Sequence, residues 1–186
     1  MTEPGFAVWI TGLSGAGKST IAEGLAAALR QAGRKVEVLD GDQVRATLNS
    51  DLGFSKEARD ANVRRLGFVA RLLARNGVAV IVAAISPYRA VRAEVRAAIE
   101  AEGRGFVEVY ARCSIDELTR RDVKGLYQRA LRGELPGFTG VSDPYEEPLA
   151  PDVVFDSGSE TEEHSLRRLL EHLEVKGLLP AAPLSF

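Results

Sequence analysis

Nine consecutive residues near the N-terminus could hold the phosphates of a nucleotide. The stretch Gly12-Leu13-Ser14-Gly15-Ala16-Gly17-Lys18-Ser19-Thr20 fits the pattern G-x-x-x-x-G-K-[ST] of the P-loop. Its glycines would let backbone N–H groups approach phosphate oxygens, and the N-terminus of a following helix would add a positive dipole. Lys18 could reach the β- and γ-phosphates, and the Ser19 hydroxyl could bind Mg²⁺. The stretch therefore predicts a site for a nucleoside triphosphate.

Two aspartates that flank a glycine could serve phosphoryl transfer at such a site. Asp40 and Asp42 follow an apolar run. Phosphoryl transfer needs a carboxylate that holds Mg²⁺ or its waters, and often another that accepts the proton of the acceptor. Asp-Gly-Asp is also a common surface turn. In a chain that carries a P-loop, we favour the functional interpretation.

Basic and amide side chains crowd the region after these aspartates. The set is Arg45, Arg59, Asn62, Arg64 and Arg65, with few acids nearby in the sequence. Guanidinium groups suit the oxygens of phosphate and sulfate. The alternative for some of them is a solvated helix face.

A serine follows the most apolar run of the chain. Ser86 is succeeded by Pro87, and serine at the N-cap with proline next is a common start of a helix. The Ser86 hydroxyl could also face the substrate or accept phosphate. No histidine lies nearby in the sequence to activate it, which disfavours nucleophilic catalysis.

The stretch from Arg120 to Pro151 is rich in glycine and proline. Loops of this length are usually functional or mobile, so we expect a lid at about residues 120–150. Lys124 lies in its basic beginning, where a cation could neutralise charge that develops during transfer. Phe138 puts a ring into a polar loop, where it could stack on a purine or anchor the loop in the core.

Apolar runs and helical patterns alternate along the chain and would position these residues. We expect strands at 6–10, 36–39, 78–85, 106–112 and 153–155, and helices at 21–30, 56–76 and 87–102. Capping boxes at 114–117 and 159–162 predict two more helices. The alternation predicts an α/β fold, a mostly parallel five-stranded sheet with helices on both faces. Ligands bind such sheets beyond the carboxyl ends of the strands, where the polar motifs fall.

Composition excludes several classes of protein. The 186 residues suit a single domain spanning 1–186, and a net charge of −2 gives no reason to expect a nucleic-acid or membrane partner. The longest apolar run, 78–85, is too short to span a bilayer. Cys113 is the only cysteine, which fits a reducing cytoplasm, and the N-terminus does not resemble a signal peptide.

These motifs together resemble the adenylylsulfate kinase (APS kinase) family, over nearly the whole chain from Val8 to about Val154. Besides the P-loop, the matching stretches are 39–42 with 44–45, 51–55, 62–65, 85–89, 121–122 with 124–127, and 137–140 with 143–146. The resemblance implies a P-loop NTPase fold and transfer of the γ-phosphoryl group of ATP to the 3′-hydroxyl of adenosine 5′-phosphosulfate (APS), with Mg²⁺. The products would be 3′-phosphoadenosine 5′-phosphosulfate (PAPS) and ADP, in sulfate assimilation.

The resemblance also implies roles for individual residues. Implied catalytic residues are Lys18, Asp42, Ser86 and Lys124. ATP would be bound by Gly12, Leu13, Ser14, Gly15, Ala16, Gly17, Lys18, Ser19 and Thr20, with Mg²⁺ at Ser19 and Asp40, partly through water. The acceptor would lie among Asp42, Arg45, Phe54, Arg59, Asn62, Ile85, Ser86, Lys124 and Phe138.

Within this set, Asp42 would orient or deprotonate the acceptor hydroxyl. Arg45, Arg59 and Asn62 would grip the phosphosulfate and ribose, and Phe54 and Phe138 would enclose the adenine. Ser86 matches a serine that the family records as a phosphoserine intermediate, and direct in-line transfer is equally compatible with the sequence.

The resemblance further implies a homodimer and leaves room for a functional link to a separate ATP sulfurylase. The chain departs from the family at Ala61 and Phe68, where glutamate is usual. One alternative function is another small-molecule kinase that acts on a nucleoside, a sugar acid or an antibiotic. Less favoured alternatives are an inactive scaffold and a nucleotide-dependent switch. A switch that binds GTP would need an Asn-Lys-x-Asp motif, which the sequence lacks.

Overall fold

The computed structural model describes residues 4–122 and 124–179. Within these ranges five strands form one parallel sheet, which confirms the predicted fold class. The strands are β1 (Phe6–Thr11), β2 (Val36–Asp40), β3 (Ala79–Ala83), β4 (Gly105–Arg112) and β5 (Val153–Asp156). Their order across the sheet is β2-β3-β1-β4-β5, so β1 lies at the centre.

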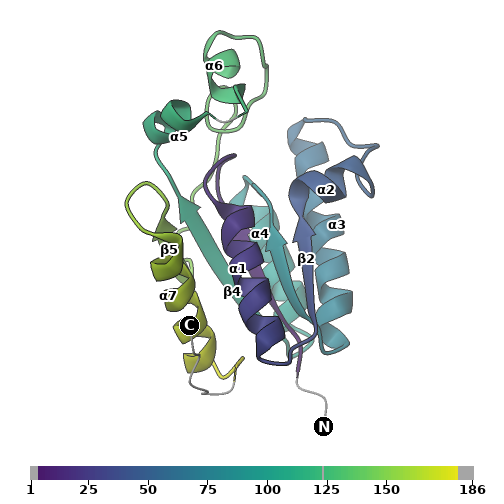
Figure 1. The fold of residues 1–186 in the computed structure, drawn as a ribbon. Helices are drawn as coiled ribbons and strands as arrows, with labels where there is room; N and C mark the ends of the chain where they lie inside the picture. Colours follow the sequence, from purple (N-terminus) through teal and green to yellow (C-terminus); the bar gives the residue numbers. More distant parts are fainter. Residues whose placement is uncertain (1–3, 123, 180–186) are drawn as a thin grey trace.

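Seven helices accompany the strands in the described chain, and the last of them follows the final strand. They are α1 (Lys18–Gln31), α2 (Gly41–Ala46), α3 (Lys56–Arg75), α4 (Arg89–Glu100), α5 (Ile115–Arg121), α6 (Leu126–Leu131) and α7 (Glu162–Val175). Figure 1 shows α1 and α7 on one face of the sheet and α3 and α4 on the other. Helices α5 and α6 stand beyond the carboxyl ends of the strands (Figure 1).

Two apolar cores hold these layers together, one on each face of the sheet. Side chains of β1 alternate between them, because successive residues of a strand point to opposite faces. Phe6, Val8 and Ile10 pack with buried residues of α1 and α7, whereas Ala7 and Trp9 pack with those of α3 and α4. All six residues of β1 are buried, as expected for a central strand covered on both sides.

One predicted helix start is confirmed by its cap, and the bounds of another helix agree closely with the prediction. Ser114 accepts a hydrogen bond from the Glu117 amide at 3.2 Å, as in the predicted capping box. Helix α3 begins at Lys56 and ends at Arg75, one residue short of the prediction.

Two predicted helix starts are wrong. Helix α4 begins at Arg89 rather than at Ser86-Pro87, because Ser86 adopts a left-handed backbone with φ 41°. Helix α7 begins at Glu162 with Thr161 as its N-cap, two residues after the predicted capping serine. The short helices α2 and α6 were not expected from the sequence, and residues 180–186 of the C-terminal tail lie outside the described residues.

No helix within the described ranges is both long and apolar enough to cross a bilayer.

Candidate active site

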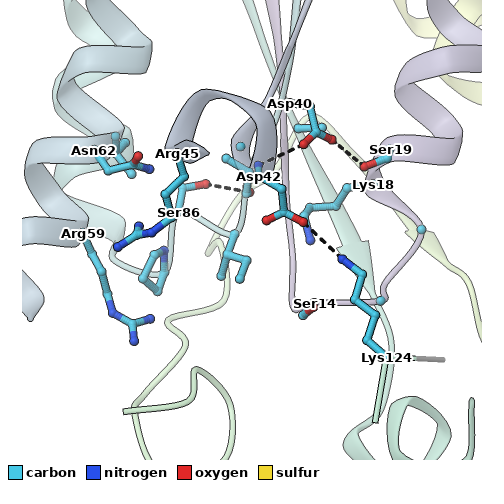
Figure 2. A pocket seen from close by; sticks show the side chains of 18 of the residues that line it. Ser14, Lys18, Ser19, Asp40, Asp42, Arg45, Arg59, Asn62, Ser86 and Lys124 are labelled. Atoms are coloured by element: carbon cyan, nitrogen blue, oxygen red, sulfur yellow. Dashed lines mark hydrogen bonds and ion pairs between the residues drawn. The ribbon is translucent and has the colours of Figure 1, made fainter. Parts of the chain in front are cut away.

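A cavity of about 390 Å³ opens at the carboxyl ends of β1, β2 and β3. Its walls come from the P-loop, the start of α2, the first turns of α3, the turn after β3 and Lys124. The predicted site residues that line it are Ser14, Gly15, Gly17, Lys18, Ser19, Thr20, Asp40, Asp42, Arg45, Phe54, Arg59, Asn62, Ile85, Ser86 and Lys124. Figure 2 shows ten of the lining residues labelled around this space.

The P-loop wraps the N-terminus of α1 as its sequence predicts. Gly17 occupies the N-cap position with φ 86°, a left-handed conformation that side chains rarely adopt. Gly12 leaves no room for a side chain, since a Cβ there would lie 2.4 Å from the Ala111 carbonyl oxygen. Lys18 folds back so that its Nζ donates a hydrogen bond to the Leu13 carbonyl at 2.7 Å. The loop therefore holds the ammonium group of Lys18 at the wall of the cavity.

The Lys18 ammonium is poorly solvated among these peptide groups. Burial is the main cause that lowers its pKa to about 8, and the charges of Asp42 and Asp40 only partly oppose that effect. An anion bound at the loop would favour the charged form of Lys18.

Asp40 serves both local structure and the site. Its Oδ1 accepts hydrogen bonds from the amides of Asp42 at 2.9 Å and Gln43 at 3.3 Å, which caps α2. Its Oδ2 accepts a hydrogen bond from the Ser19 hydroxyl at 2.8 Å. A hydroxyl and a carboxylate in contact are hard oxygen donors of the kind that Mg²⁺ prefers. The described chain holds no group of three or more His, Cys, Asp or Glu side chains suited to a metal.

Asp42 faces the centre of the cavity, between Lys18 and Lys124 (Figure 2). Lys124 Nζ lies 3.2 Å from Asp42 Oδ2, and the two side chains are 65% and 84% exposed. An ion pair this exposed contributes little to stability, so the Asp42 carboxylate is free to exchange partners.

The half-buried Arg45 and the exposed Phe54 stack on each other at the rim of the cavity. The Arg45 guanidinium lies 4.2 Å from the centre of the Phe54 ring, and it also donates a hydrogen bond to the Gly53 carbonyl. Burial, and next the nearby charge of Arg59, lower the pKa of Arg45. Asn62 Oδ1 accepts a hydrogen bond at 2.7 Å from Asn49, which is fully buried.

Arg59 joins α3 to the loop that contains Phe138. It is 9% exposed and donates hydrogen bonds to the Phe54 carbonyl, the Thr139 hydroxyl and the Gly137 carbonyl. It also pairs with Asp143 at 3.2 Å. The guanidinium therefore lines the cavity while it anchors residues 137–143.

Four of the residues to which the family resemblance assigns a role do not line the cavity, and neither do Arg64 and Arg65, which pair with Glu94 and Asp51. Gly12, Leu13 and Ala16 lie behind the P-loop surface, where Leu13 supplies the carbonyl that Lys18 contacts. The Phe138 ring meets Tyr127 edge to face, 5.1 Å between centres, and packs against the apolar core that includes Tyr127. Phe54 and Phe138 thus have different surroundings.

One contact that sequence spacing could not indicate ties the predicted lid to the P-loop. The Tyr127 hydroxyl donates a hydrogen bond to the Ser14 carbonyl at 2.5 Å. These residues are 113 positions apart, and Tyr127 lies in the stretch 124–127 that matches the family.

Comparison with known proteins places the chain among sulfate-activating kinases. Residues 4–156 match the sequence model of the family described as adenylylsulphate kinase. An adenylyl-sulfate kinase of Myxococcus xanthus is 58% identical over 178 residues, which cover 96% of each chain. A probable bifunctional SAT/APS kinase of Sorangium cellulosum is 56% identical over 176 residues, 95% of this chain but only 30% of that longer protein.

A solved structure shows the same likeness in three dimensions. The Mycobacterium tuberculosis APS kinase CysC, in complex with AMPPNP and APS, superposes with a TM-score of 0.88 at 41% sequence identity. The match covers 92% of this chain and 99% of that one.

Proposed function

This chain belongs to the adenylylsulphate kinase family, and from that premise we propose how its cavity transfers the γ-phosphoryl group of ATP to the 3′-hydroxyl of APS. The observation that supports this most is one continuous cavity. It brings the P-loop and the Ser19–Asp40 pair together with Asp42 and the Arg45–Phe54 rim.

The P-loop side of the cavity binds ATP. Its backbone N–H groups and Lys18 hold the phosphate chain, and the Lys18 charge stabilises the negative charge on the transferring group. Ser19 and Asp40 would hold Mg²⁺, which supplies charge neutralisation and alignment of the phosphates when bound.

The opposite side binds and activates the acceptor. Asp42 takes the proton of the 3′-hydroxyl as its oxygen forms the bond to phosphorus and ADP leaves. Arg45 and Asn62 hold the phosphosulfate and ribose oxygens, and Phe54 stacks on the adenine. Arg59 and Phe138 remain proposed acceptor residues, although in this structure they hold the 137–143 loop.

Transfer is direct rather than through Ser86. The Ser86 residue is 3% exposed, and its Oγ accepts a hydrogen bond from Trp9 Nε1 at 3.0 Å and donates one to the Ala84 carbonyl at 3.1 Å. A hydroxyl that is already engaged on both sides is a poor phosphate acceptor.

Residues 120–150 act as a lid over a single kinase domain that spans 1–186. Lys124, which reaches into the cavity from this segment, supports that role. We further propose a homodimer, a cytoplasmic location and a functional link to a separate ATP sulfurylase. The Sorangium relative supports that link, since its name joins a second activity to the kinase in one chain.

An acceptor panel tests the proposed function. ADP formation by the purified chain with MgATP would be compared for APS, adenosine and gluconate. We expect ADP formation to depend on APS and to stay at background with the other two. Turnover with gluconate or adenosine but not APS would overturn the proposal.

A further inference from the structure

The turn after β3 holds a serine in an unfavourable backbone conformation. Ser86 has φ 41°, a left-handed value that non-glycine residues rarely adopt, and it lines the cavity. A side chain in the left-handed region is strained and persists only where its surroundings enforce it. The side chains that hold Ser86 in this conformation therefore help to shape the cavity.

Buried side chains of β1 and α4 donate hydrogen bonds to this turn. Trp9 of β1 binds the Ser86 hydroxyl, and Thr11, at the end of the same strand, donates to the Ile85 carbonyl at 2.6 Å. From α4, Arg92 donates to the Ser86 carbonyl at 2.6 Å. Trp9 and Thr11 are both fully buried.

Arg92 lies at the centre of this arrangement. It is 3% exposed, and each of its three nitrogens has a partner: Glu108 at 2.9 Å, the Ser86 carbonyl, and the Glu146 carbonyl at 2.8 Å. Glu108 compensates the buried charge, which would otherwise be strongly destabilising. The planar guanidinium fork can hold three acceptors at fixed angles, whereas a lysine ammonium cannot reproduce that geometry.

The third partner of Arg92 belongs to the end of the predicted lid. There the Glu146 amide donates to the Pro87 carbonyl at 2.8 Å, and the Glu146 carboxylate accepts a hydrogen bond from the Arg89 amide at 2.8 Å. The side chain of Tyr88, the N-cap residue of α4, makes no capping hydrogen bond, so the Glu146 carboxylate caps this helix instead. Hydrogen bonds thus join the cavity wall directly to the end of the predicted lid.

We infer that Arg92 is a positioning residue for the acceptor: it holds the strained Ser86 turn against residues 145–147 and so sets the wall Ile85–Pro87 of the acceptor side. This inference rests on the proposed function, because it assigns that wall to the acceptor. Arg92 does not line the cavity and acts through the turn alone.

The first test is Arg92→Lys, which keeps the charge opposite Glu108. We expect the KM for APS to rise by about tenfold while the KM for MgATP stays within about twofold, because the P-loop lies across the cavity. The matched control is Arg96→Lys on the same helix; Arg96 pairs with Asp152 and lies over the Phe106 ring, away from the turn. It should leave both constants unchanged.

A merely structural role would give a different pattern. It would lower the melting temperature and the active fraction, and neither changes a KM. Unchanged KM values in Arg92→Lys would therefore overturn the inference. If that protein does not fold, Thr11→Val removes another bond to the same turn; it should raise the KM for APS by about threefold, and an unchanged value would count equally against the inference.

The second test asks whether Arg92 acts through the backbone of Ser86. Glycine adopts positive φ without strain, so Arg92→Lys should raise the KM for APS by no more than about threefold on a Ser86→Gly background. The same tenfold rise on both backgrounds would show that Arg92 does not act through the turn. Loss of APS turnover in the unmodified chain would instead overturn the proposed function.

Discussion

The two sides of the cavity are built in different ways. The nucleotide side is one stretch of nine residues that runs from the end of β1 into the first turn of α1, and its shape comes from backbone turns fixed by the buried strand behind them. The acceptor side collects single side chains from α2, α3, the turn after β3 and the predicted lid. Its residues are held by partners far away in sequence, such as Arg59 by Gly137 and Asp143.

This difference separates what a local motif can specify from what only packing can specify. Changes on the nucleotide side should abolish turnover whatever the acceptor. Changes on the acceptor side should mainly alter the KM for APS. The predictions below test that division, from the largest effect to the smallest.

Lys18→Ala should lower kcat by about 10³-fold, because it removes the charge that stabilises the transferring phosphoryl group. The measurement is kcat at saturating MgATP and APS. Lys35→Ala is the matched control, an exposed lysine before β2, and should behave as wild type. A kcat close to normal in Lys18→Ala would remove the P-loop lysine from the mechanism.

Asp42→Asn should lower kcat by about 10²-fold, since an amide cannot accept the proton of the acceptor hydroxyl. The KM for MgATP should change little, because Asp40 rather than Asp42 contacts Ser19. Asp116→Asn, an exposed aspartate in the first turn of α5, is the control. Should Asp42→Asn retain most of its kcat, proton transfer through this carboxylate would be excluded.

Phe54→Ala and Phe138→Ala should differ. Phe54 is 67% exposed and lines the cavity, so its loss should raise the KM for APS by about tenfold, in line with stacking worth ~1–3 kcal/mol. The melting temperature of the Phe54→Ala variant should equal that of the wild type. Phe138 packs against Tyr127 and the core, so Phe138→Ala should lower the melting temperature as well as raise that KM.

Equal effects of the two substitutions on both readouts would contradict the different surroundings of these rings. An unchanged KM for APS in Phe138→Ala would remove Phe138 from the acceptor side.

The pH dependence should be the smallest effect. The pKa of Lys18 is lowered from 10.5 to about 8, chiefly by burial, and the charged form is the active one. The kcat/KM for MgATP should therefore fall by about twofold between pH 7 and pH 8. A value that rises over this range would contradict the assignment.

At higher pH the free energy of unfolding should rise while the activity falls. Between pH 8 and 10.5 the unfolded chain carries the Lys18 proton and the folded chain does not. The unfolded state then binds more protons, so this group makes the free energy of unfolding rise with pH. Activity that falls without loss of stability would show that deprotonation, not unfolding, causes the decline.

The fold and the nucleotide side could be predicted because their signals are local. Alternating apolar runs indicate a parallel sheet, the P-loop motif fits between a buried strand and a helix, and Ser114 with Glu117 predicts a helix start.

The Ser86 turn shows why the rest could not be predicted. Ser-Pro is a strong local signal for a helix start, but Trp9 and Arg92 bind Ser86 in another conformation from 77 positions before it and six after it. Phe138 is a second case, because no local pattern distinguishes a ring that stacks on a ligand from one that packs on Tyr127. In both cases tertiary contacts outweigh the local preference.

The most direct test of the two-sided cavity is the position of the phosphate in the product. The chain would be incubated with MgATP and APS, and the product analysed by phosphorus NMR, with 3′-deoxy APS as the control acceptor. The account predicts phosphate on the 3′-oxygen and no ADP formation beyond background with the control. Phosphate at any other position, or ADP formation that does not need the 3′-hydroxyl, would contradict it.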